Sequence, residues 1–173
     1  MEKAERGDCM IVVSDTTPLI SLMKIGRLGL VEQLFGEVQI PDAVYMELIT
    51  NPQFSEEAQQ IQNSSFIKRV AIDDSKSVDL LRRATGLDRG ESEAIILSDT
   101  CHADLLLMDE VKGRQVAKQM GLHLMGTVGM LRVAYEEKLI SYDGVIECIE
   151  VLRANGRHIS DRVFKQLLES IQP

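Results

Sequence analysis

Residues 10–18 decide the fold, and they read Met-Ile-Val-Val-Ser-Asp-Thr-Thr-Pro. The apolar run over residues 10–14 predicts a buried strand that ends at Asp15. Residues 16–18 then break the strand into a polar turn before a helix. In open α/β sheets the ligand site lies at the carboxyl ends of the strands. This stretch therefore places a carboxylate where such a site is expected.

Residues 105–108 form a second apolar run that ends in an acid, Asp109. Two such strands in one sheet bring two carboxylates to the same edge. Converging carboxylates without an equal number of cations repel one another, so at least one is expected to have a raised pKa without metal. A hard divalent cation is the usual remedy. For Asp15 or Asp109 alone, the alternative is a helix N-cap.

Short apolar segments alternate with helical segments along the chain. Strands are predicted over residues 10–14, 38–40, 66–72, 105–108 and 122–125. Helices are predicted over residues 18–25, 28–35, 41–49, 55–62, 75–84, 91–100 and 112–120, and after residue 126 in three pieces broken near residues 140–142 and at Gly156. Parallel strands need such crossovers, and strands this apolar are covered on both faces. The predicted fold class is α/β, with a parallel sheet between two layers of helices.

The 173 residues suit a single domain, which we expect over residues 10–173 after a disordered tail of residues 1–9. No apolar stretch reaches the ~18 residues that a membrane span needs, and the charged N-terminus is unlike a signal peptide. We therefore expect a cytoplasmic protein. The three cysteines fit neither a disulfide framework nor a zinc site, and reduced thiols are expected at Cys9, Cys101 and Cys148.

The net charge of −8 by itself argues against a nucleic-acid partner, because phosphate binding is mainly electrostatic. A cluster of metal-binding acids weakens this argument, since such a cluster does not repel a substrate once the metal is bound. Removing one charge of the cluster, as in Asp15→Asn or Asp109→Asn, is expected to be neutral or stabilising without metal.

Further acids lie on predicted helices. Glu47 borders the apolar stripe formed by Val44 and Leu48, although a Glu in such a place is more often solvated. Glu91 and Glu93 open an otherwise apolar helix, where the helix dipole favours anions. Because they are two residues apart, they lie ~200° apart around the helix and cannot both face one point.

The alternative for the start of this helix is a capping box. Asp88 would be the N-cap residue, and Glu91, three residues on, would return a hydrogen bond to it. A capping box would explain Asp88 and Glu91 without any catalytic or metal-binding role.

Six motifs occur in order along the chain. They are Asp-Thr-Thr-Pro-Leu-Ile at residues 15–20, Pro-x-x-Val-x-x-Glu-Leu at 41–48, Gly-Glu-x-Glu-Ala at 90–94, Leu-Leu-Leu-x-Asp at 105–109, Lys-Gly-Arg-x-x-Ala at 112–117 and Gly-Thr-x-Gly-x-Leu at 126–131. As an ordered set they resemble the PIN-domain family (the PilT N-terminal domain), and within it small prokaryotic PIN-like proteins related to toxin ribonucleases. The resemblance runs from about residue 10 to the C-terminus.

The resemblance implies a three-layer α/β/α sandwich and a Mg²⁺- or Mn²⁺-dependent endoribonuclease that hydrolyses RNA. Carried over motif by motif, the catalytic and metal-binding acids are Asp15, Glu47, Glu91 and Asp109, with Glu93 a second candidate for the third position. The family usually has Asp where Glu91 stands, so the longer side chain departs from the pattern. Candidate substrate contacts are Thr16, Lys112, Arg114 and Thr127, for which turn, cap or solvated helix positions are the alternatives.

The resemblance also implies partners. These are an RNA substrate, an antitoxin protein if the chain is the toxin of a toxin–antitoxin pair, and a second copy of the chain in a homodimer. The apolar segment over residues 145–152 supports a dimer, unless it packs on its own sheet.

Three other functions stay open. A haloacid-dehalogenase-type phosphatase also uses a strand-end Asp, but it needs Asp-x-Asp, and Thr17 takes the second position. A receiver domain leaves the Gly-Glu-x-Glu-Ala helix without a role. A non-enzymatic PIN-like interaction module would retain the acids without activity.

Overall fold

The computed structural model describes residues 9–171, so the tail expected over residues 1–9 lies, apart from Cys9, outside the described residues. Along the chain the elements are β1 (Val12–Ser14), α1 (Thr16–Lys24), α2 (Gly29–Phe35), β2 (Val38–Pro41), α3 (Asp42–Thr50), the 3₁₀ turn η1 (Pro52–Phe54), α4 (Ser55–Asn63), β3 (Ile67–Val70), α5 (Ser75–Thr85), α6 (Arg89–Thr100), β4 (Leu105–Leu107), α7 (Val111–Gln119), β5 (Leu124–Met125), α8 (Thr127–Glu136), α9 (Tyr142–Ala154) and α10 (Asp161–Ser170).

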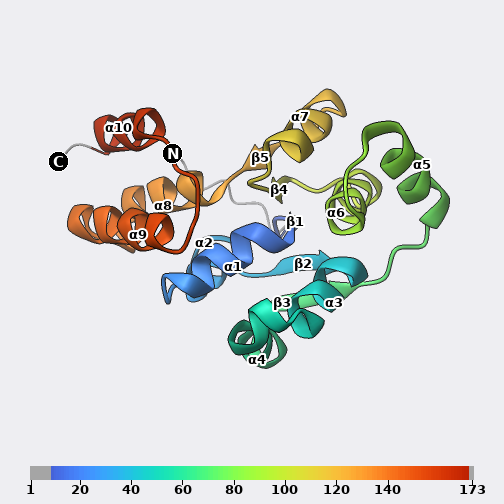
Figure 1. Cartoon of the computed structure of the whole chain (residues 1–173), viewed down its shortest axis with the longest axis horizontal. Coiled ribbons are helices and arrows are strands. Elements are labelled where there is room, and N and C mark those ends of the chain that lie inside the picture. The colour runs from blue at the N-terminus through green and yellow to red at the C-terminus, as the bar shows by residue number, and fades with distance from the viewer. Residues whose placement is uncertain (1–8, 172–173) are drawn as a thin grey trace.

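The five strands form one sheet in the order β3-β2-β1-β4-β5, and every neighbouring pair is parallel. Helices flank the sheet on both sides (Figure 1). The predicted α/β fold with a central parallel sheet is therefore confirmed.

Alternate residues of the central strands face two separate cores. Val12 and Leu107 belong to a core shared with α1, α2, α8 and α9. Val13 and Leu106 belong to a second core shared with α6 and α7. The strands are apolar on both faces because each face meets a layer of helices.

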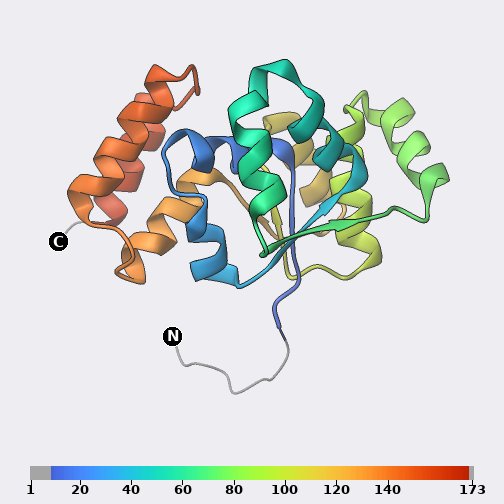
Figure 2. The same ribbon diagram turned by 90° about the horizontal axis from the view of Figure 1, so that it is seen from below.

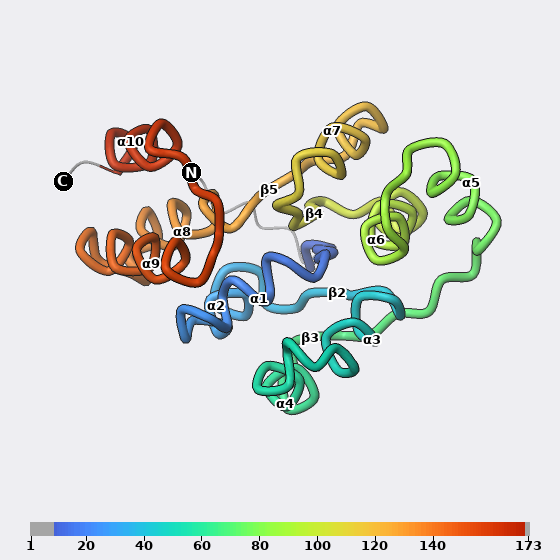
Figure 3. Tube along the Cα trace, in the orientation of Figure 1, coloured from blue at the N-terminus to red at the C-terminus, as the bar shows by residue number. Residues whose placement is uncertain are grey.

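The order of the strands creates a switch point between β1 and β4. From β1 the chain moves outward to β2 and β3, and it then returns through α5 and α6 to β4 on the other side of β1 (Figures 2 and 3). β1 and β4 pair in register from Val12↔Leu105 to Ser14↔Leu107. Because ligand sites form at the carboxyl ends of strands at such a point, the residues after Ser14 and Leu107 are the ones to examine.

Two helices begin two residues earlier than the sequence predicts. α1 begins at Thr16 and α6 at Arg89. In both cases the preceding Asp has an extended backbone, with ψ of 172° at Asp15 and 177° at Asp88, and the helix begins at once after it. Pro41, predicted in a first helical turn, instead ends β2, where it pairs with Val70.

The apolar C-terminal segment is packed inside its own chain. Val145, Ile149 and Leu152 of α9 are buried in the larger core. Its apolar content therefore gives no separate argument for a dimer. Across residues 9–171, all helices are too short or too polar to cross a membrane. The three cysteines are free thiols.

Two glycines provide a matched test of packing. A Cβ at Gly113 of α7 would lie 2.6 Å from Sδ of the fully buried Met108, whereas a Cβ at Gly29 of α2 would meet nothing within 4 Å. We expect Gly113→Ala to lower the free energy of unfolding by about 1–3 kcal/mol through overpacking. Gly29→Ala should raise it by up to about 1 kcal/mol through helix propensity. Urea unfolding of both variants checks the opposite signs, and equal effects would contradict the close approach of α7 to β4.

Candidate active site

Asp15 is the buried carboxylate at the end of β1. Only 4% of the residue is exposed. It occupies the N-cap position of α1, yet its side chain makes no capping hydrogen bond to that helix. Helix capping therefore does not explain why a carboxylate is buried at this place.

Burial raises the pKa of Asp15 to about 7, because a charged carboxylate loses its hydration there. The backbone N–H of Thr16 beside the carboxylate lowers the pKa, while the negative charges of Asp88, Glu91 and Glu47 raise it. The expectation of a carboxylate with a raised pKa is thus confirmed, with burial as the larger cause and like charges as the smaller one.

Glu47 reaches the same region from α3. The hydroxyl of Thr16 donates a hydrogen bond to Glu47 Oε2 over 2.8 Å and so ties the start of α1 to α3. A Cβ at Gly90 would lie 3.4 Å from Glu47 Oε2 and 3.5 Å from Asp88 Oδ1. The carboxylates of Glu47 and Asp88 therefore flank the same glycine in the first turn of α6.

Asp88 and Glu91 form a capping box at the start of α6. The backbone N–H of Glu91 donates to Asp88 Oδ1 over 2.8 Å, and that of Asp88 donates to Glu91 Oε2 over 2.9 Å. Burial raises the pKa of Glu91, and so do the charges of Asp88 and Glu110, whereas the N–H of Asp88 and the charge of Lys112 lower it. Helix capping and closeness to Asp15, predicted as alternatives, occur together.

Glu93 is buried on the same helix but has different neighbours. Its Oε2 accepts a hydrogen bond from the backbone N–H of Ala43 over 2.8 Å, and its Oε1 accepts one from Arg89 over 2.9 Å. Ala43 lies in the first turn of α3, so Glu93 caps that helix from a distance. These contacts favour Glu91 over Glu93 as the third acid of the site.

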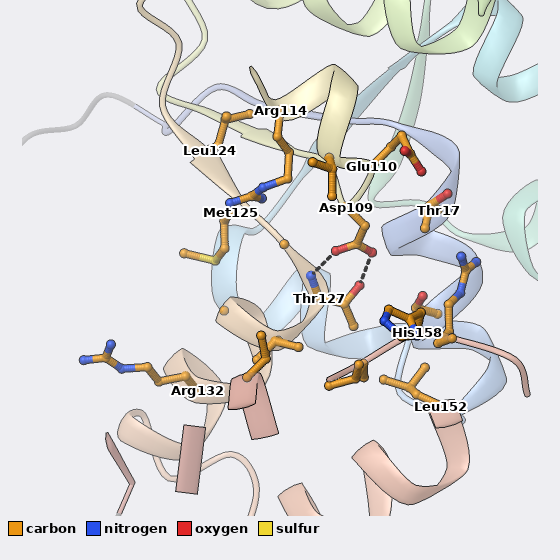
Figure 4. Close-up of a pocket in the computed structure, with 18 of the residues that line it drawn as sticks. Thr17, Asp109, Glu110, Arg114, Leu124, Met125, Thr127, Arg132, Leu152 and His158 are labelled. Carbon is orange, nitrogen blue, oxygen red and sulfur yellow. Dashed lines mark hydrogen bonds between the residues drawn. The ribbon is translucent and has the colours of Figure 1, made fainter. Parts of the chain in front are cut away.

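Asp109 caps a helix that starts 18 residues later. Its Oδ1 accepts a hydrogen bond from the backbone N–H of Thr127 over 2.7 Å, and its Oδ2 accepts one from the hydroxyl of Thr127 over 2.6 Å (Figure 4). Gly126 permits this approach, because a Cβ there would lie 2.8 Å from Asp109 Oδ1. Asp109 is therefore a helix cap, but for α8 rather than for α7, which follows it in the chain.

The fold thus brings together Asp15, Glu47 and Glu91 and adds Asp88 to them, while Asp109 is engaged by Thr127. Within residues 9–171, no group of three or more His, Cys, Asp or Glu side chains is arranged so that it could hold a metal ion. The carboxylates interact through their charges, but they direct oxygens at separate hydrogen-bond donors.

The chemistry of this set nevertheless fits a hard divalent cation. All of its donors are carboxylate oxygens. Asp15 is buried among acids, and no Lys or Arg of the described chain is among the charges that act on it.

The four predicted substrate contacts have different surroundings. Thr16 and Thr127 bind the carboxylates of Glu47 and Asp109. Arg114 donates to the carbonyl of Met108 over 2.7 Å and lines a cavity beside Asp109. Lys112 is exposed, and its Nζ lies 3.1 Å from the Cβ position of Gly86, away from that cavity's lining.

Asp88 is the acid that the sequence predicted only as a helix cap. The sequence nevertheless held a signal that Asp88 lies close to Asp15. α6 leads into the parallel strand β4 and packs against β1, so it runs antiparallel to both strands and its capping residue lies at the edge where Asp15 ends β1.

The sequence of the chain matches a known protein family. The sequence profile of the PIN domain matches residues 11–173, a range that includes every strand of the sheet and each acid named above. No curated protein matches the chain.

Replacing Asp15 by Asn should stabilise the metal-free protein above neutral pH. The pKa of Asp15 is about 7 in the folded state and about 3.9 in unfolded chains, so the folded state binds more protons and the wild type loses stability as the pH rises between these values. The variant does not titrate there. Its free energy of unfolding should exceed that of the wild type by on the order of a few kcal/mol at about pH 8, and this difference should shrink towards about pH 4.

Urea unfolding in EDTA across this pH range measures the effect, with Glu93→Gln as a buried control on α6. A difference between Asp15→Asn and wild type that does not change with pH would contradict the raised pKa.

The two hydrogen bonds from Thr127 change the stability that we expect of variants at Asp109. Asp109→Ala should lower the free energy of unfolding by about 1–3 kcal/mol, because a buried N–H and a buried hydroxyl lose their acceptor. Asp109→Asn should also destabilise, since only one of its two side-chain heteroatoms accepts from an N–H. Thr127→Ser keeps both donors and serves as the control. If urea unfolding gives Asp109→Ala the same free energy of unfolding as the wild type, the two hydrogen bonds contribute no stability.

Proposed function

Because the chain belongs to the PIN domain family, whose members are typically nucleases and commonly metal-dependent, we propose that it is a Mg²⁺- or Mn²⁺-dependent endoribonuclease. One observation carries the proposal beyond the family. Asp15 is a buried carboxylate at the switch point of the sheet, surrounded by acids and without a cationic partner in the described chain. Such a group is costly unless it has a ligand to bind.

Asp15, Glu47 and Glu91 would hold the ion, and Asp109 would complete the ligand set. Glu47 Oε1 and Glu91 Oε1 accept no hydrogen bond from residues 9–171, so each keeps an oxygen for a ligand. Thr16 orients Glu47, and the N–H of Asp88 orients Glu91. When bound, such an ion supplies Lewis acidity at a scissile phosphate.

Burial of Asp15 assists this role in two ways. It excludes water from one side of the carboxylate, which strengthens its interaction with a cation. It also means that a cation at the site shifts Asp15 to its charged form, so binding of the ion should release a proton near neutral pH.

The proposed partners rest on the family resemblance. We propose that the chain acts as the toxin of a toxin–antitoxin pair in the cytoplasm, that an antitoxin protein restrains it, and that it forms a homodimer. Light scattering at tens of micromolar tests the dimer, and a monomeric mass would contradict it.

The test of the nuclease combines cleavage with metal binding. Wild-type protein should cut single-stranded RNA in Mn²⁺ and not in EDTA. Asp15→Asn, Glu47→Gln and Glu91→Gln should each lower the rate by more than about 100-fold. Glu93→Gln decides between the two candidates for the third acid, because its contacts to α3 predict retained cleavage.

Thermal unfolding in Mn²⁺ provides the second readout. Mn²⁺ should raise the melting temperature of the wild type by binding the folded state, and it should have no effect on Asp15→Asn. Purified protein that neither cuts RNA nor responds to Mn²⁺ would instead support the non-enzymatic interaction module.

A further inference from the structure

A cavity of about 1080 Å³ opens beside Asp109, on the β5 side of the switch point. We call it the C-terminal groove. It extends from Thr17 of α1 and Asp109 past β5 to α8 and the segment between α9 and α10 (Figure 4). Sites for small molecules usually measure about 300–1,000 Å³, so this groove is large enough for a segment of a polymer.

Basic side chains from three parts of the chain line the groove. They are Arg114 of α7, Arg132 of α8, and Arg157 and His158 between α9 and α10. In Figure 4, Arg114, Arg132 and His158 lie on different sides of the space around the Asp109–Thr127 pair. Basic groups distributed in this way suit a ligand that carries several anionic groups along its length.

These basic groups are available to a ligand to different degrees. In the part of the chain that the structure describes, Arg157 and His158 form no ion pair. Arg132 pairs with Glu136 over 2.9 Å, but the two side chains are 54% and 47% exposed, and exposed pairs contribute little stability. A phosphate can therefore replace Glu136 as the partner of Arg132.

The rest of the lining combines apolar side chains with three acids, Asp109, Glu110 and Glu136. The apolar side chains include Met125, Val128 and Ile159, together with Val111, which is 66% exposed, and Val163, which is 39% exposed. No Phe or Tyr is among the lining residues of the described chain, and His158 is the one aromatic ring there on which a base could stack. Contacts to base faces need an unpaired strand, because a duplex keeps its base faces stacked.

We propose that the C-terminal groove binds the backbone of single-stranded RNA beside the cleaved phosphate, and that it does so without preference for the bases. This inference rests on the proposed nuclease function and names its substrate class. Phosphates would lie against Arg132, Arg157 and His158, and sugars and base faces against the valines and Ile159. The groove starts at Asp109, two residues after Leu107, whose carbonyl accepts from the backbone N–H of Asp15, so a strand lying in it would pass the end of β1.

Binding can be measured apart from cleavage. Fluorescence anisotropy with labelled RNAs of about 12 nucleotides, in EDTA so that a metal-dependent nuclease leaves them intact, gives Kd for oligo-U, oligo-A and a mixed sequence. The Arg132→Ala/Arg157→Ala double variant should weaken all three about tenfold or more and lower the slope of log Kd against log salt by about 0.7 for each lost phosphate contact. Arg157→Lys should retain most of the affinity, since a phosphate needs only a charge.

The matched control is Arg82→Ala/Arg83→Ala, which removes the same charge from exposed positions on α5 at the other end of the molecule (Figure 1). It should leave Kd within about twofold of wild type. Equal weakening by both double variants, or a preference above tenfold for one base, would overturn the proposal.

Failure of the groove and failure of the nuclease give different results. Salt-dependent RNA binding that needs Arg132 and Arg157, without any cleavage in Mn²⁺, would reject the nuclease and keep the groove. Cleavage that depends on Asp15, with RNA binding unaffected by the arginine substitutions, would reject the groove and keep the nuclease. Equal melting temperatures of the variants exclude unfolding as the cause.

Discussion

The pairing of β1 with β4 is the interaction on which the rest of the structure depends. The backbone N–H of Asp15 donates to the carbonyl of Leu107 over 2.9 Å, so the residue that ends β1 is held against the end of β4. The two strands are neighbours in the sheet but far apart in sequence, and the chain leaves them towards opposite edges. The acids gather on one side of the carboxyl ends of β1 and β4, and the C-terminal groove opens on the other.

The acids at this point accept their hydrogen bonds from neutral donors. Glu47 accepts from a threonine hydroxyl, and Asp88 and Glu91 accept from each other's backbone N–H. Neutral donors satisfy carboxylate oxygens without cancelling their charge. The region therefore keeps a net negative charge, which an ion pair to Lys or Arg would have removed. Asp15, the most buried of the set, accommodates this charge through a pKa near neutrality.

Much of the fold could be predicted from the sequence, because its strands are short, apolar and separated by clear helical segments. Each predicted strand and helix has a counterpart, with boundaries shifted by a few residues at positions such as Asp15 and Asp88. The grouping of Asp15, Glu47 and Glu91 followed from the motifs. The partner of Asp109 did not, since only the tertiary structure shows that α8 begins beside the end of β4.

The groove could not be predicted for a related reason. Arg132, Arg157 and His158 stand in unremarkable surroundings in the sequence, and no spacing links them to Arg114. They share a cavity only because α9 folds back along α8 and brings the segment before α10 to β5. Sequence motifs identify residues that one element carries together, whereas a groove assembled from several helices has no local pattern.

Asp15 and Asp109 have similar sequence contexts and different neighbours, and strand order explains the difference. Asp15 ends the central strand, so the helices that follow β2 and precede β4 bring Glu47 and Glu91 to it. Asp109 ends the strand beside β5, and a single residue, Gly126, separates β5 from α8. The N-terminus of α8, with its positive dipole end, therefore lies next to Asp109 and compensates its charge. Asp109 thereby links the end of β4, where the carbonyl of Leu107 accepts from the N–H of Asp15, to the start of the helix that carries Arg132.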